Sequence, residues 1–164
     1  KAAQQLENTG AYFLVMPCNS LHLFTKEIRA AVSIKFLSLI EETTRHLRQQ
    51  NFQSVGILAS QTTRASSLYQ DQLKQAGIEA ILPSQPTQEE VGSIIHRLVT
   101  GKKKYTDLNL LSQIIENLEQ KGAQSVALTC TDLPLLLPSH PTIEIIDTMD
   151  ILVKIAVETL VTVN

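Results

Sequence analysis

The chain has 164 residues, 43% of them hydrophobic, which is enough to bury the core of one α/β domain or two small ones. Its 14 Lys and Arg side chains stand against 16 Asp and Glu side chains, which excludes the strongly basic surface typical of nucleic-acid-binding proteins. No apolar segment approaches the roughly 20 residues that a membrane-spanning helix needs, and two cysteines are too few for a secreted disulfide scaffold. We therefore expect a cytoplasmic protein without nucleic-acid or membrane partners.

Helical and apolar stretches alternate along the first third of the chain. Apolar residues at helical spacing stop at Gly10, and a continuous apolar run then indicates a strand covered on both faces. The expected elements are a helix at 1–9, a strand at 12–16, a helix at 22–32, a strand at 34–40, a helix at 41–50 and a strand at 55–59.

The same alternation continues to the C-terminus. The expected elements are a helix at 65–75, a strand at 78–82, helices near 88–99 and 107–121, strands at 125–129 and 143–146, and a helix at 149–161. Thr87, with Glu90 three residues later, has the signature of a capping box at a helix start. Strands separated by helices at short spacing predict parallel sheets with helices on both faces.

Two stretches of the chain repeat each other at an offset of 112 residues. Residues 6–18 read L-E-N-T-G-A-Y-F-L-V-M-P-C, and residues 118–130 read L-E-Q-K-G-A-Q-S-V-A-L-T-C. Each copy has the pattern of a helix end, a capping glycine and a buried strand that ends on a cysteine. The repeat predicts two pseudo-symmetric parallel-sheet (Rossmann-like) domains facing across a cleft. A single long α/β domain that contains both units is the alternative.

Both cysteines of the chain end a predicted strand, where ligands bind in open parallel sheets. A helix start after such a strand stabilises anions and can bring a thiol pKa of about 8.5 towards neutrality. Small polar residues that suit a carboxylate or an oxyanion follow each cysteine: Asn19 and Ser20 after Cys18, and Thr131 and Asp132 after Cys130.

Several explanations fit a single cysteine at the end of an apolar strand. An inert core thiol is the commonest of them, and a disulfide and a zinc site are further alternatives, although neither cysteine lies in a C-x-x-C pattern. Two thiols at matching positions favour acid–base chemistry instead. If the repeats face each other, one thiolate can remove a proton from a carbon acid while the other thiol returns a proton to the opposite face.

Three stretches resemble motifs of the aspartate/glutamate racemase family. Residues 16–22, M-P-C-N-S-L-H, resemble the family's M-P-C-N-T-x-H, and residues 130–136, C-T-D-L-P-L-L, resemble C-T-E-[LI]-x-L-L. Residues 55–68, VGILASQTTRASSL, are similar to a strand followed by the family's G-T-x-x-S/T turn. The likeness extends over nearly the whole chain.

The resemblance implies a racemase for aspartate or glutamate that uses neither pyridoxal phosphate nor a metal. Cys18 and Cys130 would be the two acid–base residues of an inversion at Cα. The residues implied to hold the substrate's α-carboxylate are Asn19, Ser20, Thr63 and Thr131, and His22 and Asp132 would support the cysteines. For His22, a plain surface position is the alternative. Family members often form dimers, so a homodimer is the implied assembly.

The resemblance also implies a division into domains. Residues 1–48 with 149–164 would form the remainder of an N-terminal α/β domain, and residues 49–148 the second α/β domain. The family's N-terminal strand and Gly-rich turn have no counterpart here, so we expect an upstream segment to be missing and the first domain to be incomplete. Thr129 stands where the family usually has Gly, and Asp132 where it usually has Glu.

Two other functions stay open at this point. One is a racemase, isomerase or decarboxylase for a different carbon acid, such as a hydantoin or a substituted malonate, because the broader superfamily shares parts of the pattern. The other is a truncated relative that binds a carboxylate without catalysis, which the missing strand and Thr129 favour.

Overall fold

The structure is a computed structural model that describes residues 1–163 of the chain. The N-terminal part is short and contains two strands. Its elements are α1 (Ala2–Asn8), β1 (Phe13–Val15), the 3₁₀ helix η1 (Ser20–Phe24), α2 (Thr25–Ala31) and β2 (Lys35–Leu37).

The rest of the chain forms a larger unit and a long return helix. Its elements are α3 (Leu39–Gln49), β3 (Ser54–Ala59), α4 (Gln61–Ala65), α5 (Leu68–Gln75), β4 (Glu79–Ile81), α6 (Gln85–Val99), α7 (Asp107–Gln120), β5 (Ser125–Thr129), the 3₁₀ helix η2 (Leu133–Leu136), β6 (Glu144–Asp147) and α8 (Thr148–Val163). None of the helices in the described range is long and apolar enough to span a membrane.

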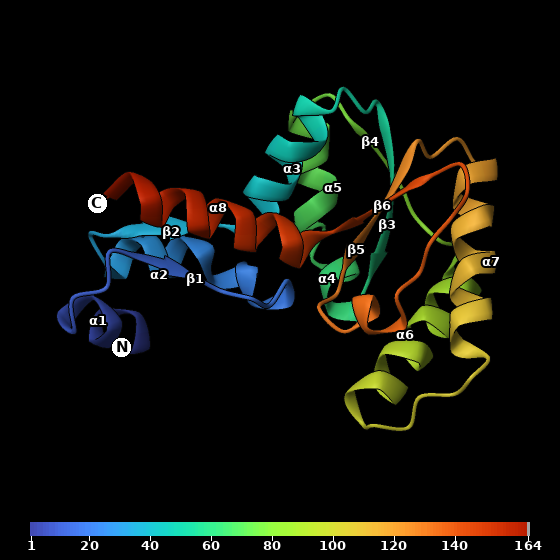
Figure 1. Cartoon of the computed structure of the whole chain (residues 1–164), viewed down its shortest axis with the longest axis horizontal. Coiled ribbons are helices and arrows are strands. Elements are labelled where there is room, and N and C mark those ends of the chain that lie inside the picture. The colour runs from blue at the N-terminus through green and yellow to red at the C-terminus, as the bar shows by residue number, and fades with distance from the viewer. Residues whose placement is uncertain (164) are drawn as a thin grey trace.

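All strand pairs are parallel, which confirms the predicted α/β class. One sheet contains β1 and β2, and the other has the strand order β4-β3-β5-β6. Because successive side chains of a strand point to opposite faces, Leu58 packs towards α6 and α7, whereas Ile57 packs towards α3 and α5. The larger sheet is therefore covered on both faces, as its apolar strands require (Figure 1).

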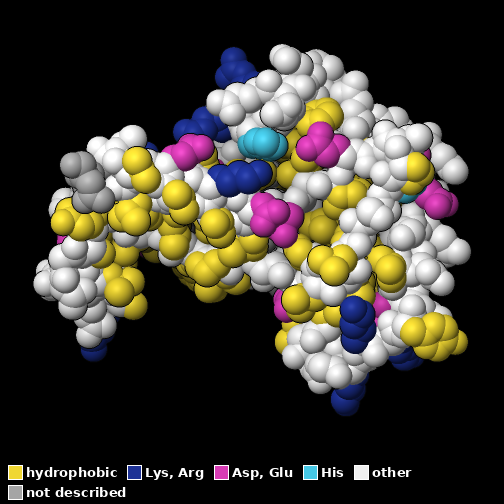
Figure 2. Space-filling view, viewed as in Figure 1, with side chains coloured by type: hydrophobic (Ala, Val, Ile, Leu, Met, Phe, Trp, Pro, Cys, Tyr) yellow, Lys and Arg dark blue, Asp and Glu magenta, His cyan; other side chains and the backbone are white. Residues whose placement is uncertain are grey.

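The last helix, α8, connects the larger sheet to the smaller one (Figure 1). It begins directly after β6, and Leu152 packs with Leu37 and Leu39 in a small buried cluster that Phe13 borders. This contact fits the expectation that the final helix returns to the N-terminal part of the chain. The smaller sheet and the larger unit are thereby held at an angle, with a broad indentation between them in the space-filling view (Figure 2).

The N-terminal part exposes many apolar side chains (Figure 2). Tyr12 is 66% exposed just before β1, and Val15 is 42% exposed within it. On α8, which packs against this part, Val153 and Val157 are 55% and 56% exposed. Single exposed apolar residues are ordinary on a protein surface, but several on one short unit form a face that more chain or another molecule could cover.

Two details of the predicted elements are wrong for the same physical reason. The strand expected at 34–40 ends at Leu37, because Ser38 accepts a hydrogen bond from the Glu41 amide and so starts helix α3. The predicted capping box at Thr87 is replaced by Ser84, whose hydroxyl accepts from the Thr87 amide. In both places a serine cap begins the helix earlier than the apolar pattern indicates.

The helix expected at 65–75 is divided into α4 and α5. Ser67 lies between them with φ of 55°, a left-handed conformation that non-glycine residues adopt at a cost of about 1 kcal/mol or more. The break turns the chain sharply, and it brings Tyr69 in the first turn of α5 into the core of the molecule.

Candidate active site

Cys18 lies in a tight turn after β1. The strand ends at Val15, and the Cys18 amide donates to the Met16 carbonyl oxygen over 2.8 Å, which reverses the chain within three residues. The thiol is half-buried, and its sulfur lies 3.5 Å from the hydroxyl oxygen of Ser20. The first cysteine is therefore accessible and has a hydroxyl beside it.

His22 contacts this turn from inside the protein. Its side chain is only 2% exposed, so the alternative of a surface position is wrong. Its Nδ1 lies 2.9 Å from the Cys18 carbonyl oxygen, and the Leu39 amide donates to its Nε2 over 2.9 Å. These contacts require a neutral ring protonated on Nδ1, and burial lowers the pKa of His22 accordingly. With both nitrogens engaged, His22 holds the Cys18 main chain against the start of α3.

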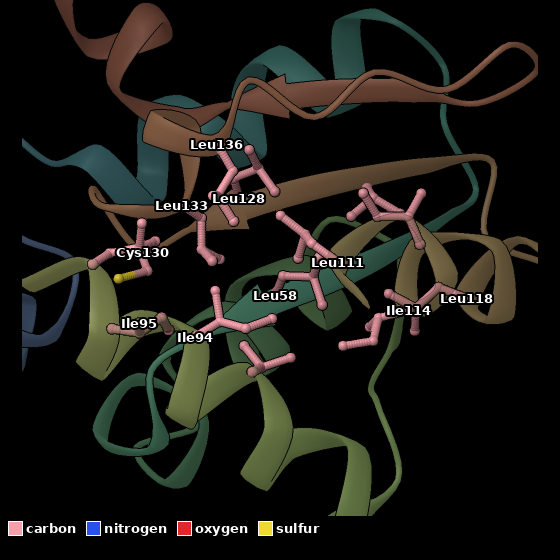
Figure 3. Packing of buried hydrophobic residues seen from close by; sticks show 14 of the residues in the cluster. Leu58, Ile94, Ile95, Leu111, Ile114, Leu118, Leu128, Cys130, Leu133 and Leu136 are labelled. Atoms are coloured by element: carbon pink, nitrogen blue, oxygen red, sulfur yellow. The ribbon is translucent and has the colours of Figure 1, made fainter. Parts of the chain in front are cut away.

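Cys130 directly follows β5 and is 8% exposed. It lies at the edge of the apolar cluster between β3, β5 and α6, and Figure 3 shows its sulfur beside Ile95. Burial raises the pKa of Cys130 to about 11, and the carboxylate of Asp132, 3.7 Å from the sulfur, contributes in the same direction. The predicted lowering of the thiol pKa is therefore wrong for Cys130. The main-chain amides of Asp132 and Leu133 at the start of η2 do lower the pKa, but burial raises it by more.

The hydroxyl-rich turn after β3 lies next to Cys130. Ala59 pairs with Thr129 in the sheet, so Ser60 and Cys130 leave the carboxyl edge at neighbouring positions. Thr63 is 1% exposed; its amide donates to the Ser60 hydroxyl oxygen, and the Ser60 hydroxyl donates to Thr63 Oγ1 over 3.1 Å. The proton of the Thr63 hydroxyl thus remains available for a ligand.

Thr131 and Thr129 lie on either side of Cys130 and differ in burial. Thr131 is half-buried in the loop that leads to η2. Thr129 is fully buried, and its hydroxyl donates to the Leu58 carbonyl oxygen over 3.0 Å. The bulk that Thr129 introduces is therefore accommodated within the sheet, on the face opposite to Cys130.

A hydrogen bond from Tyr69 joins the turn after β1 to the larger unit. The phenol of Tyr69 donates to Asn19 Oδ1 over 2.6 Å, and both side chains are buried. Asn19 Nδ2 is also buried, and it has no hydrogen-bond partner among the described residues. Sequence reasoning missed Tyr69, because an aromatic residue at an apolar helix position has the pattern of ordinary core.

The candidate residues thus fall into two groups at the ends of strands. Cys18, Asn19, Ser20 and His22 share the turn after β1, and Cys130, Thr131, Asp132 and Thr63 lie at the carboxyl edge of β3 and β5. Figure 1 shows these strand ends facing the region where the indentation of Figure 2 lies. Within residues 1–163, no group of three or more His, Cys, Asp or Glu side chains is arranged to hold a metal ion.

Comparison with known proteins gives matches to one family over nearly the whole chain. The profile of the Asp/Glu/hydantoin racemase family matches residues 1–156. The chain is 30% identical to the broad specificity amino-acid racemase RacX of Bacillus subtilis over 158 residues, which is 96% of this chain and 68% of that protein.

Solved structures support the same relationship. An aspartate racemase homologue from Pyrococcus horikoshii superposes with a TM-score of 0.85 at 24% identity, over 96% of this chain and 70% of that one. The aspartate racemase of Picrophilus torridus gives a TM-score of 0.74 at 26% identity, over 89% of this chain and 61% of that one. The chain therefore belongs to the Asp/Glu/hydantoin racemase family, a family of amino-acid racemases and hence of isomerases.

Proposed function

We propose that the protein racemises an acidic amino acid, aspartate or glutamate, by proton transfer at Cα between Cys18 and Cys130. The observation that carries the proposal is the equivalent position of the two cysteines. Each directly follows a parallel strand of the repeated unit, and each has a hydroxyl or carboxylate side chain two residues later. No cofactor is part of the proposal, since two thiols of opposite protonation state suffice for inversion.

The raised pKa of Cys130 indicates the direction in which a cycle begins. Burial favours the thiol form of Cys130, so we assign the role of the first base to the more accessible Cys18. Cys18 takes the Cα proton, and the electron pair of the broken C–H bond passes into the substrate carboxylate to give a planar carbanion. Cys130 then donates its proton to the opposite face, which leaves Cys18 as the thiol and Cys130 as the thiolate.

The resting state returns when the Cys18 thiol releases its proton to solvent and the Cys130 thiolate takes up a proton from solvent. The opposite enantiomer reacts with the state that the first conversion leaves, in which Cys130 is the thiolate that removes the proton and Cys18 is the thiol that returns one. The Asp132 carboxylate beside Cys130 disfavours the thiolate form, which keeps that sulfur protonated until substrate is bound.

We assign the α-carboxylate to the polar groups around the two cysteines. Asn19 Nδ2 and the Thr63 hydroxyl are buried donors, and within residues 1–163 no side chain accepts their protons. Ser20 and Thr131 add half-buried hydroxyls. Donors of this kind bind a carboxylate and also stabilise the negative charge that develops on it during proton removal.

One observation favours a wider substrate range as the second candidate. The relative that is 30% identical is a broad specificity amino-acid racemase, and on that basis we propose amino acids with uncharged side chains as the second substrate class. Hydantoins and substituted malonates are further carbon acids that the family description brings into consideration. All of these share the loss of a proton next to a carbonyl group.

The proposal extends to the arrangement of the whole protein. We assign residues 1–48 with 149–164 to the N-terminal domain and residues 49–148 to the second. The division of the strands between two sheets and the return of α8 to Leu37 and Leu39 support this assignment, and α3 packs against both parts. The apolar face of the N-terminal part supports a larger N-terminal domain or a homodimer. Two free thiols fit a reducing compartment, and we propose a cytoplasmic location.

Isotope exchange tests the proposed reaction. The protein is incubated in heavy water with each enantiomer of aspartate, glutamate, alanine and a substituted hydantoin, and deuterium at Cα and optical inversion are both measured. We expect deuterium and inversion with an acidic amino acid. A folded wild-type protein that exchanges deuterium into no member of the panel would refute racemisation, and exchange that is confined to alanine or the hydantoin would refute the acidic substrate.

A further inference from the structure

Asn19 is buried, and only one end of its side-chain amide forms a hydrogen bond. Its side chain is 3% exposed, its Oδ1 accepts a hydrogen bond, and its Nδ2 has no partner in the part of the chain that the structure describes. A buried amide group without a partner costs free energy unless a ligand or water supplies one. The unsatisfied end of this amide belongs to the residue directly after Cys18, so its orientation bears on the site.

Tyr69 decides which end of the amide is left free. The residue is fully buried in α5, and its phenol donates to Asn19 Oδ1 over 2.6 Å. Burial raises the pKa of Tyr69, so the phenol stays protonated and remains a donor throughout the neutral range.

The single proton of Tyr69 is donated to Asn19 Oδ1 over 2.6 Å, and two threonine hydroxyls also lie near the phenol. The hydroxyls of Thr43 and Thr148 face the same phenol oxygen, but each of them already donates to a main-chain carbonyl. Thr43 donates to the Leu39 oxygen over 2.7 Å, and Thr148 donates to the Leu128 oxygen over 3.0 Å. The threonine protons are therefore directed away from the phenol oxygen, and the phenol's own proton is directed at Asn19 Oδ1.

An asparagine amide has an acceptor end and a donor end, and only the donor end binds an anion well. Because the phenol occupies Oδ1, the amide presents Nδ2 on its other side. If the amide were reversed, its oxygen would face the carboxylate of the substrate and repel it. The orientation of one side chain therefore changes a binding group into a repelling one.

We propose that Tyr69 is a positioning residue that fixes the Asn19 amide with Nδ2 directed at the substrate's carboxylate. This inference rests on the proposed function and adds a residue to it that no motif of the chain indicates. Tyr69 lies on α5, six residues after Thr63, whereas Asn19 lies in the turn after β1. The same hydrogen bond thus links the turn that carries Asn19 to the helix that follows the Thr63 turn.

A double-mutant cycle separates positioning from folding. The variants are Tyr69→Phe, Asn19→Ala, the double variant and Asn19→Asp, with Tyr105→Phe as the matched control because Tyr105 is 92% exposed. For each variant, the dissociation constant of L-aspartate is measured by its protection of Cys18 against iodoacetamide, and KM and kcat are measured by deuterium exchange. The protection assay reports binding even where no turnover occurs.

Loss of the phenol hydrogen bond should weaken aspartate binding about fivefold in Tyr69→Phe, with KM raised more than kcat is lowered. Asn19→Ala should weaken it about 30-fold, and the double variant should bind no more weakly than Asn19→Ala. Asn19→Asp keeps the acceptor for Tyr69 but presents a carboxylate to the substrate, so it should bind more weakly than Asn19→Ala. Tyr105→Phe should match the wild type.

Two results would overturn the proposal. If Tyr69→Phe costs the same factor with and without Asn19, the phenol acts on folding alone, and if Asn19→Ala binds as tightly as the wild type, Nδ2 is not a ligand. The proposed reaction fails separately: a wild type that binds aspartate without exchanging deuterium refutes racemisation, and the binding cycle then still decides the role of Tyr69. A wild type that binds no carboxylate refutes both.

Discussion

The pKa of the buried thiol predicts a measurable dependence of stability on pH. Burial raises the pKa of Cys130 from 9.0 to about 11, and unfolding returns the thiol to its ordinary value. Between these values the unfolded chain loses the proton before the folded one does. The stabilisation from the buried thiol is therefore fully present below about pH 9, and it is lost as the pH rises through the folded pKa.

The size of the effect follows from the same two values. The difference between 9.0 and about 11 corresponds to about 3 kcal/mol of unfolding free energy in the alkaline limit, and to about 1 kcal/mol at about pH 10. Replacing Cys130 by Ala also changes packing, but that cost is independent of pH. We therefore expect the stability advantage of the wild type over Cys130→Ala to shrink by about 1 kcal/mol between about pH 8 and pH 10.

Urea unfolding at these two pH values measures this advantage directly. Cys18→Ala is the matched control, because Cys18 is the other free thiol and is half-buried rather than packed in the apolar cluster. A constant difference between the wild type and Cys130→Ala across the pH range would show that the Cys130 thiol is not desolvated. The assignment of Cys130 as the thiol that starts protonated would then lose its physical basis.

Two further predictions concern the frame around the site. A Cβ at Gly56 in β3 would lie 2.9 Å from Val126 Cγ2, so Gly56→Ala should destabilise the fold by about 1–3 kcal/mol in urea unfolding. At Gly92 no atom of the described residues outside the neighbouring helix backbone lies within 4 Å of a Cβ. Gly92→Ala should therefore raise the free energy of unfolding by up to about 1 kcal/mol, because alanine is the better helix former. Equal losses of stability in the two variants would contradict the packing around Gly56. Burial lowers the pKa of His22, so its stabilisation is present above its unfolded pKa of about 6.5 and lost as the pH falls through the folded value. His22→Gln should be less stable at neutral pH and less sensitive to acid in thermal melts at about pH 5 and 7, and an unchanged acid sensitivity would contradict the buried neutral ring.

Local patterns predicted most of the elements of the fold. The repeated helix–glycine–strand–cysteine unit depends on neighbours in sequence, and both of its glycines have the left-handed conformation that the pattern indicates, with φ of 90° at Gly10 and 97° at Gly122. The strand expected at 34–40 was too long because an apolar run fits a strand and a buried helix start equally well. There the Ser38 cap decides between the two.

The candidate site was predictable only in part, for a similar reason. The two cysteines could be placed at strand ends, because apolar runs followed by polar turns mark those ends. The Tyr69–Asn19 hydrogen bond joins residues 50 positions apart, and Cys130 is buried in a cluster that includes Ile95 of α6. Neither contact has a local signal, so the orientation of Asn19 and the raised thiol pKa of Cys130 emerge only from the folded chain.

The central claim is that the two sulfurs act on opposite faces of one substrate, and separate cysteine variants test it most directly. Each enantiomer of aspartate is incubated in heavy water with Cys18→Ser and with Cys130→Ser, and deuterium at Cα is measured apart from inversion. The two-thiol account predicts that inversion falls at least about 100-fold in both variants. It also predicts that residual deuterium exchange survives for opposite enantiomers in the two variants. Inversion at the wild-type rate in either single variant would contradict it.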